Sequence, residues 1–259
     1  MLRIYFMLKN QYLKTALEYS FNFWMMFIAG VLMRVLMMGV AFVMYRNVDS
    51  IGGFSEGEMY LLLSLIFFSE GMCNILFDGI WHLPALIFRG EFDVMLCRPV
   101  SPLYQILSYE IGLQGTGGLV LSIISLVMSV NAMHWLSPLN GLLMLLFVLT
   151  GMALRASSTL IGVSTAFFMD TGGSNSNAFT IHTVGEFAKY PLPIYPMWLR
   201  GLLFSAIPFA FIGYVPVLIL RGENALMWTL LLIAVTIGYF ALARGIFYRG
   251  IRKYESMGM

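Results

Sequence analysis

Charged residues are scarce in this chain of 259 amino acids. Lys, Arg, Asp and Glu together contribute 11% of the sequence, whereas apolar residues contribute 59%. A soluble domain carries about 25% charged and about 45–50% apolar residues. The composition therefore excludes a water-soluble domain and indicates an integral membrane protein. No polar linker divides the chain, so we expect residues 1–259 to form a single transmembrane domain.

Residues that build metal centres and nucleophilic active sites are also few. Cys73 and Cys97 lie in or beside apolar segments without metal-ligand spacing, which indicates reduced thiols and not a disulfide or a metal site. His82, His134 and His182 are isolated, and the sequence contains no zinc-protease pair, nucleophile elbow or paired carboxylates. An enzyme acting within the membrane is therefore poorly supported. We expect no catalytic residue, no metal and no bound cofactor in this chain.

Long apolar runs dominate the remainder of the sequence. About 20 apolar residues in an α-helix cross the hydrocarbon core of a bilayer. Five or six runs are long enough, and they cover residues 21–45, 59–80, 105–130, 139–168, 199–220 and 225–247. The five tryptophans fall near the ends of runs, as interfacial tryptophans do. The sequence therefore predicts an all-α integral membrane protein with six spans, surrounded by lipid and without a nucleic-acid partner.

Basic residues gather on one side of these predicted spans. They precede the first span, follow the last and occur in the loop after the second, whereas the opposite side holds chiefly Arg46 and Arg221. Cytoplasmic loops carry an excess of Lys and Arg. This distribution predicts that both termini and the 81–104 loop lie in the cytoplasm, which six crossings satisfy.

Residues 1–20 are too polar to cross the membrane. On a helix, an apolar stripe would comprise Ile4, Leu8, Tyr12 and Leu13, and the polar face would comprise Arg3, Asn10, Lys14 and Glu18. This pattern predicts an amphipathic helix lying in the inner membrane interface. An ordinary cytoplasmic start to the first span is the alternative. The charged opening followed by a long apolar run does not fit a cleavable signal.

The segment between the fourth and last runs allows two topologies. Residues 170–175 are polar, residues 191–196 are rich in proline, and Pro208 and Pro216 interrupt the run 199–220. In one version, 170–198 is a cytoplasmic loop and 199–220 crosses the membrane. In the other, about 176–192 forms the fifth span and 199–220 folds back as a re-entrant element, which is tolerated only inside protein or beside a cavity. Hydropathy leaves both versions open.

Four of the charged residues within the apolar runs are candidates for a site. Each costs at least about 2.5–3.5 kcal/mol at the centre of a spanning helix, so each needs a partner or a function. Arg34 and Glu70 occupy the centres of two antiparallel runs, and we predict that they pair. Glu110, near the start of the third run, and Arg155, in the fourth, are the other candidates. These residues form either an internal ion pair that fixes helix packing or a polar patch on a translocation path.

Small residues mark positions where helices can approach closely. Ser158, Gly162 and Ala166 repeat every four residues in the fourth run, and the third run contains Gly112, Gly115, Gly117 and Gly118. We expect these residues to pack helices within the bundle or at a dimer interface. The glycines are no phosphate-binding loop, because the Gly-Lys-Ser/Thr ending is missing. The 20 methionines either line a surface that adapts to varied apolar ligands or simply fill membrane-facing positions.

The loop between the second and third runs is the most informative segment. Four charged residues occur within ten positions: Arg89, Glu91, Asp93 and Arg98. The pattern predicts a short helix with a charged edge that comprises Arg89, Glu91 and Asp93 and an apolar edge that comprises Phe88, Phe92, Met95 and Leu96. Pro99 and Pro102 end the helix and direct the chain back to the membrane. A helix of this kind suits docking on a soluble partner.

Together these features resemble the permeases of type-2 ATP-binding-cassette exporters. The shared features are an interfacial N-terminal helix, six spans, a charged loop after the second span and a Pro-rich fifth region. The similarity to one small-permease branch covers essentially the whole chain. Three stretches carry it: Arg89-Gly90-Glu91-Phe92-Asp93 with Arg98-Pro99 and Pro102-Leu103; Ile207-Pro208-Phe209 with Tyr214-Val215-Pro216; and the tail from Tyr248-Arg249 to Tyr254-Glu255-Ser256.

The resemblance implies a division of labour between subunits. A separate ATPase would bind ATP-Mg, and the loop around 85–98 would be the coupling helix seated in its groove. The contact residues would be Phe88, Arg89, Gly90, Glu91, Phe92, Asp93, Arg98 and Pro99. Two permeases, identical or non-identical, and two ATPases would form the transporter in a bacterial-type plasma (inner) membrane. The resemblance also favours the re-entrant version of 199–220.

We therefore expect a permease subunit that exports an apolar or amphipathic small molecule. An ion-coupled secondary transporter that uses the buried Arg and Glu residues is the first alternative, although the chain lacks the inverted repeat that such folds often show. A membrane assembly factor without transport activity is the second. A neighbouring ATPase gene would separate the permease from both alternatives.

Overall fold

The computed structural model describes residues 5, 7, 9–11, 13, 14, 20–135 and 137–255. Five long helices dominate these residues: α2 (Ser20–Tyr45), α3 (Glu56–Phe77), α7 (Gln114–Met133), α8 (Pro138–Ser164) and α12 (Ala225–Lys253). Shorter α-helices connect them: α4 (Leu83–Phe88), α5 (Glu91–Leu96), α6 (Pro102–Leu107), α9 (Ser176–Gly185), α10 (Met197–Phe204) and α11 (Tyr214–Leu220). The 3-10 turns are η1 (Asp78–His82), η2 (Thr165–Phe167), η3 (Glu186–Lys189), η4 (Leu192–Ile194) and η5 (Phe209–Phe211).

These helices form an all-α integral membrane protein. The five long helices, with their adjoining turns, are long and apolar enough to cross a membrane. The bent pair of α10 with η5–α11 brings the number to six if it is counted as one span. The first, second, fourth and last predicted runs correspond to α2, α3, α8 and α12, within a few residues at most ends.

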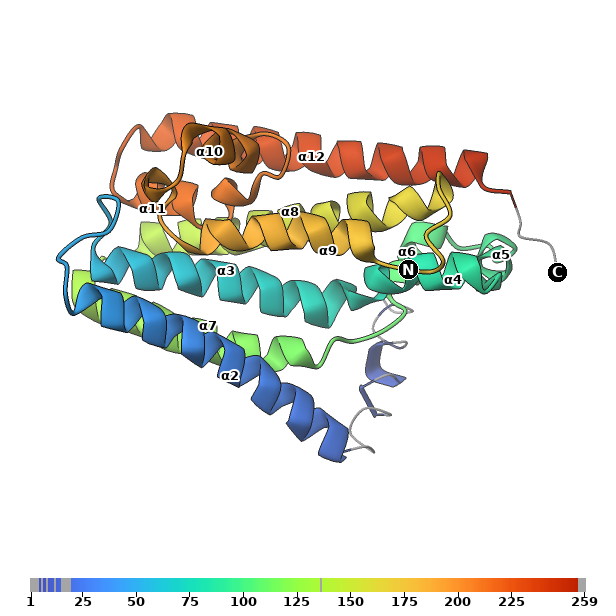
Figure 1. The fold of residues 1–259 in the computed structure, drawn as a ribbon, viewed down its shortest axis with the longest axis horizontal. Coiled ribbons are helices and arrows are strands. Elements are labelled where there is room, and N and C mark those ends of the chain that lie inside the picture. The colour runs from blue at the N-terminus through green and yellow to red at the C-terminus, as the bar shows by residue number, and fades with distance from the viewer. Residues whose placement is uncertain are drawn as a thin grey trace.

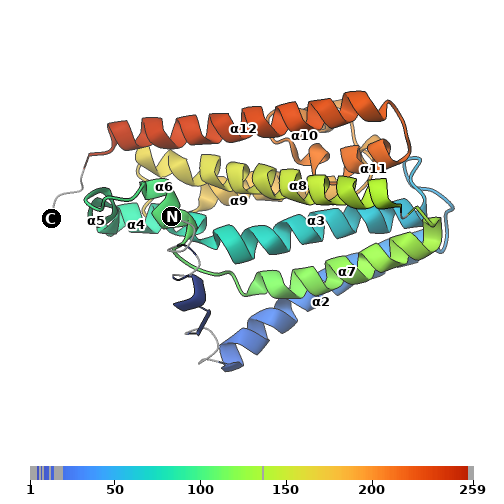
Figure 2. The same ribbon diagram turned by 180° about the vertical axis from the view of Figure 1, so that it is seen from behind.

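Helix α3 lies at the centre of the bundle, with α2, α7 and α8 packed around it (Figure 1). Its consecutive leucines Leu61, Leu62 and Leu63 are at most 1% exposed. The helix begins with a capping box, in which the Glu58 carboxylate accepts the backbone N–H of Ser55 at 2.8 Å. Helix α12 covers α8 on the far side from α3, and α2 diverges from α3 toward its own N-terminal end (Figure 2).

The α3–α7 contact is so close that it requires glycine on both helices. A Cβ atom at Gly115 would lie 2.6 Å from the carbonyl oxygen of Gly71, and a Cβ at Gly71 would lie 2.8 Å from that of Gly115. Gly162 on α8 likewise lies against Ala178 of α9, where an added Cβ would come within 2.5 Å of the Ala178 Cα. The predicted role of small residues in packing within the bundle is confirmed at these positions.

The third predicted run, 105–130, is wrong at its start. Residues 105–107 belong to α6, residues 108–113 are not helical, and α7 begins at Gln114. The Gly112 N–H donates to the carbonyl oxygen of Asn74 at 3.1 Å, which ties the chain to α3 before the crossing begins. A Cβ at Gly112 would lie 2.7 Å from the Asp78 carboxylate, so this close approach also needs glycine. Hydropathy could not detect a contact between two separate segments.

Residues 191–221 enter and leave the bundle at one end. At the start of this segment, Pro191 and Ile194 lie against Gly52 of the α2–α3 loop. At its end, Arg221 donates to the Gly53 carbonyl oxygen at 2.6 Å. Between these points, α10 and η5–α11 are bent by 74°. Helix α9, followed by η3, runs back along α8 toward this end (Figure 1).

The bend excludes a straight helical crossing over 199–220, and the two ends of the segment beside Gly52 and Gly53 favour the re-entrant version over a broken span. The break falls at residues 205–208, where Pro208 cannot donate a backbone hydrogen bond. Pro216 does not break the chain, because it lies in the first turn of α11, where its missing N–H has no intrahelical partner to lose.

The described N-terminal residues are helical and lie beside the C-terminal end of α3 and the segment that follows α6. The Tyr5 hydroxyl donates to the Leu76 carbonyl oxygen, and the Lys9 ammonium donates to the Glu110 carbonyl oxygen. Leu13 and Lys14 are both exposed. Most of the predicted interfacial helix over 1–20, including Arg3, Ile4, Leu8, Tyr12 and Glu18, lies outside the described residues.

Candidate functional site

A cluster of buried charges centres on Glu70 of α3. Its carboxylate Oε1 lies 3.1 Å from Arg34 Nη2 on α2, and its Oε2 lies 3.6 Å from Arg155 Nη2 on α8. Lys189 of η3 approaches Oε2 to 4.0 Å and also pairs closely with Glu186. The three cationic side chains are 6–10% exposed. The predicted Arg34–Glu70 pair is confirmed, and it belongs to a larger group that joins four elements of the bundle.

Further contacts hold the two arginines in place. Arg34 Nη1 donates to the Gly30 carbonyl oxygen at 2.9 Å, and its guanidinium lies 5.9 Å from the centre of the Phe67 ring. The Arg155 guanidinium lies 5.4 Å from the centre of the Phe209 ring. A carbonyl oxygen or an aromatic ring contacts each guanidinium, so these contacts hold the two arginines in place in addition to the Glu70 carboxylate.

Phe209 belongs to the tip of the α10–α11 segment and closes one side of this cluster. The side chain is 2% exposed, and its ring lies 5.6 Å from the His182 ring. A Cβ at Gly185 would lie 2.0 Å from Phe209 Cδ2, so the ring occupies the space that any larger residue at Gly185 would need. His182 Nε2 is 2.9 Å from Thr159 Oγ1 of α8. The tip of the returning segment therefore reaches the charged centre of the bundle.

A cavity of about 700 Å³ borders this cluster. Helix α2 contributes Met26, Met33 and Met37 to its lining together with Arg34, and the other charged members of the cluster line it from α3, α8 and η3. The lining also includes the uncharged polar residues Asn74, Gln114, Thr159 and Asn175, the aromatic residues Trp81 and Phe179, and Asp78. The cavity combines a flexible apolar side with a charged side, which is an arrangement suited to an amphipathic molecule.

Glu110 does not join the buried cluster. It lies in the non-helical segment before α7, where its carboxylate Oε2 is 2.6 Å from His82 Nε2. Its side chain is 43% exposed. The hydrogen bond with the His82 imidazole holds the pKa of the Glu110 carboxyl below its usual value. This residue therefore links η1 to the α6–α7 segment, outside the spanning part of α7.

The charged loop after α3 forms an elbow of two short helices, not the single helix predicted. Helix α4 ends at Phe88, and α5 begins at Glu91, because Gly90 adopts φ +71°, a left-handed conformation that favours glycine. Phe92 is fully buried and Met95 is 7% exposed, so these two residues anchor α5 to the bundle. The predicted apolar edge is thus divided: Phe92 and Met95 face inward, whereas Phe88 and Leu96 are exposed.

The outer surface of the elbow mixes apolar and charged side chains. Phe88 is 52% exposed and Val94 is 57% exposed. Arg89 and Glu91 are also exposed and form a loose pair at 3.8 Å. Arg98 and Pro99 lie exposed at the end of α5, and Asp93 is half-buried. We call this set the elbow surface; it comprises Phe88, Arg89, Glu91, Val94, Leu96, Arg98 and Pro99.

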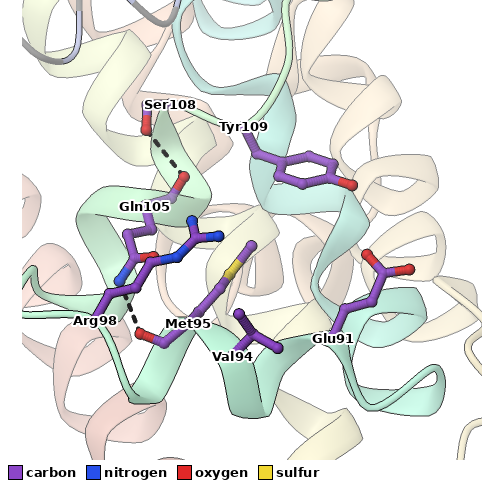
Figure 3. Close-up of a pocket in the computed structure, with 7 residues that line it drawn as sticks. All are labelled: Glu91, Val94, Met95, Arg98, Gln105, Ser108 and Tyr109. Atoms are coloured by element: carbon purple, nitrogen blue, oxygen red, sulfur yellow. Dashed lines mark hydrogen bonds between the residues drawn. The ribbon is translucent and has the colours of Figure 1, made fainter.

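A groove of about 340 Å³ lies between α5 and α6, next to the elbow surface (Figure 3). Its floor is fixed by Gln105, whose amide donates to the carbonyl oxygens of Met95 at 2.9 Å and Val100 at 2.8 Å. Glu91 and Arg98 stand at its two sides. The groove is therefore a rigid recess with one acidic and one basic rim residue.

An aromatic cluster connects the elbow to the ends of two spanning helices. The Phe92 ring lies 5.3 Å from the Phe167 ring at the end of α8 and 5.4 Å from the Tyr254 ring after α12. Phe167 also packs edge-on against Phe247 of α12, with ring centres 5.7 Å apart. Burial and the neighbouring Asp93 carboxylate raise the pKa of the Tyr254 hydroxyl to about 12. Movement of α5 would therefore press directly on α8 and α12.

Sequence reasoning missed three members of the buried cluster, Lys189, Glu186 and His182. All three lie in the segment 176–192, which crosses the bundle in the re-entrant version, and a charged residue in that predicted span would have been the available signal. Arg155 was a candidate, but nothing in its sequence position indicated that it shares a carboxylate with Arg34. In the part of the chain that the structure describes, no group of three or more His, Cys, Asp or Glu residues could hold a metal ion.

Comparison with known proteins gives one match. The family model described as ABC-2 family transporter protein matches residues 30–258, which includes most of α2, all of the later spanning helices, the elbow and the charged cluster. No curated protein and no solved structure matches the chain. Since the matched region covers far more than half of the sequence, the chain belongs to the ABC-2 family of transporter proteins.

Proposed function

We propose that this chain is the permease subunit of an exporter that moves an apolar or amphipathic small molecule out of the cell. Membership of the ABC-2 family supports a membrane subunit that works with an ATPase, and not an ATPase itself. The family also favours ATP-driven transport over ion-coupled transport. ATP-Mg would be bound by the partner subunit, and a second permease, identical or non-identical, would complete the assembly.

The elbow surface is the observation that carries this proposal. Exposure of the apolar side chains of Phe88 and Val94 to water is unfavourable, and a partner that covers them would remove this cost. The exposed charges of Arg89 and Glu91 would orient the ATPase on the elbow surface. The groove beside Gln105 would accept a side chain of the ATPase. The elbow lies at the end of the bundle where basic residues predict the cytoplasm.

The contacts within the chain suggest how ATP would drive transport. Closure of the ATPase dimer would push α5, and Phe92 would transmit the push to Phe167 and Tyr254. Helix α8 carries Arg155, so its displacement would alter the charged wall of the cavity. The cavity would then alternate between a state open to one side of the membrane and a state open to the other. Binding of ATP would change the relative free energies of these two states.

A docking assay tests the proposal. The variant Glu91→Lys combined with Val94→Asp should insert normally in the membrane but lose most of the co-purifying ATPase, because both side chains are exposed and neither supports the fold. Glu223→Lys, an exposed acidic position at the opposite end, is the matched control and should retain the ATPase. Normal co-purification together with coupled transport in the elbow variant would contradict the proposed docking surface.

A further inference from the structure

The charges around Glu70 do not balance. Three cationic groups, Arg34, Arg155 and Lys189, meet two carboxylates, Glu70 and Glu186. With the His182 ring counted as neutral, the cluster carries one surplus positive charge. An uncompensated charge in a low-dielectric interior is strongly unfavourable, so a site of this kind attracts an anion.

The remaining acid of the cavity lining does not neutralise this surplus. Asp78 lies eight residues beyond Glu70 along α3 and its continuation, about 12 Å away at 1.5 Å per residue. It lies against Gly112, just before the start of α7. Glu70 and Glu186 are the more exposed members of the cluster, at 21% and 43%, but both are already engaged by cations. A cationic ligand that enters the cavity would therefore meet a net repulsive field.

We propose that the cavity binds the acidic headgroup of an amphipathic molecule, a carboxylate or a phosphate, next to Arg34, Arg155 and Lys189. The apolar chain of that molecule would lie along Met26, Met33 and Met37 of α2, whose flexible thioethers adapt to different chain shapes. Asn74 and Gln114 supply neutral hydrogen-bond donors beside the headgroup. This inference rests on the proposed function, since it names the substrate class of the proposed exporter.

Equilibrium binding to the purified permease in nanodiscs of neutral phosphatidylcholine tests this inference. Four probes share one ten-carbon chain: decanoate, decyl phosphate, decanol and decyltrimethylammonium. Decanoate or decyl phosphate should bind at least about tenfold more tightly than decyltrimethylammonium, a ratio that corresponds to about 1.4 kcal/mol. The ratio between the two acids identifies whether the headgroup is a carboxylate or a phosphate.

Three variants test the charge balance itself. Lys189→Gln removes the surplus and should weaken binding of the acid about tenfold, whereas Glu186→Gln raises the surplus to two and should strengthen it. The double variant Lys189→Gln/Glu186→Gln restores a surplus of one and should bind the acid nearly as the native chain does. Arg252→Gln removes an exposed cation outside the cavity and should leave binding unchanged. Where Lys189→Gln does not fold, Glu186→Gln, at a half-exposed position, carries the test.

Preference for decyltrimethylammonium, or equal binding of acids and cation, would overturn the inference. Weaker acid binding in Glu186→Gln would overturn it as well. Failure of the proposed function gives a different result: the acids would bind in the cavity, but the reconstituted permease–ATPase complex would show no ATP-dependent transport of any probe. ATP-dependent transport of the cation alone would leave the proposed function standing and remove this substrate class.

Discussion

The buried cluster and the elbow use the same residue types in opposite ways. In the bundle, Arg34 and Glu70 approach to 3.1 Å and their side chains are 10% and 21% exposed. On the elbow, Arg89 and Glu91 are 3.8 Å apart and 67% and 48% exposed. Water screens the elbow pair almost completely, whereas the buried pair has no solvent to replace a lost partner. Buried charge therefore fixes the helices, and exposed charge is available to a second protein.

The largest expected effect is a difference in thiol labelling between the two ends of the bundle, because these ends should face opposite sides of the membrane. Cys97 on the elbow is exposed, and Trp198 on α10 is 71% exposed. In a chain whose single cysteine replaces Trp198, with Cys73 and Cys97 changed to Ser, a membrane-impermeant thiol reagent should label intact cells. A chain with Cys97 as its single cysteine should react only after the cells are opened. Labelling of both positions from the same side would contradict a re-entrant 199–220.

Removing the central carboxylate should produce the largest loss of stability. Glu70→Gln leaves Arg34 and Arg155 without a carboxylate partner, next to Lys189 which retains Glu186, at a cost of about 3–5 kcal/mol by analogy with broken buried pairs in soluble proteins. The expected readouts are a lower midpoint of thermal unfolding in detergent and a smaller monodisperse fraction.

A double-mutant cycle measures the direct part of that effect. Arg34→Met combined with Glu70→Gln should be less destabilising than the sum of the single changes, with a coupling free energy of about 0.5–3 kcal/mol. Additive effects would refute a direct interaction between the two side chains. Arg46→Met on the exposed end of α2 is a matched control for the loss of one arginine.

Within the elbow, burial should separate two phenylalanines. Phe92→Ala removes a fully buried ring and should destabilise the chain by about 3 kcal/mol. Phe88→Ala removes a ring that is 52% exposed and should change the free energy of unfolding by less than about 0.5 kcal/mol, while reducing ATPase co-purification. Equal destabilisation by the two changes, measured by thermal unfolding of the isolated permease, would be incompatible with the division between anchor and docking surface.

The smallest effect is expected from the exposed ion pair. Arg89→Ala should alter the unfolding free energy by less than about 0.5 kcal/mol, because exposed pairs contribute little and are screened by salt. Its effect should appear in the rate of association with the ATPase, and it should diminish as ionic strength rises. A loss of stability comparable to that of Glu70→Gln would mean that the elbow pair is part of the fold.

The sequence by itself determined the class of the protein and most of its long helices. Scarce charge and long apolar runs predicted an all-α membrane protein, because a bilayer imposes length and composition on each spanning helix separately. The pairing of Arg34 with Glu70 was also predictable, since antiparallel neighbours of known length place their centres at one depth. The prolines of the elbow were visible as the end of a helix, but the break at Gly90 and the burial of Phe92 were not.

Only the tertiary structure brought Arg155, Lys189 and Glu70 together. Their convergence depends on how α8 and α9 rotate about their axes and on the path of the chain between Gly185 and Phe209, neither of which hydropathy records. The start of α7 was decided in the same way, by the hydrogen bond from Gly112 to Asn74. Local sequence fixes which segments can cross a membrane, whereas contacts between distant segments fix which of their side chains share a cavity.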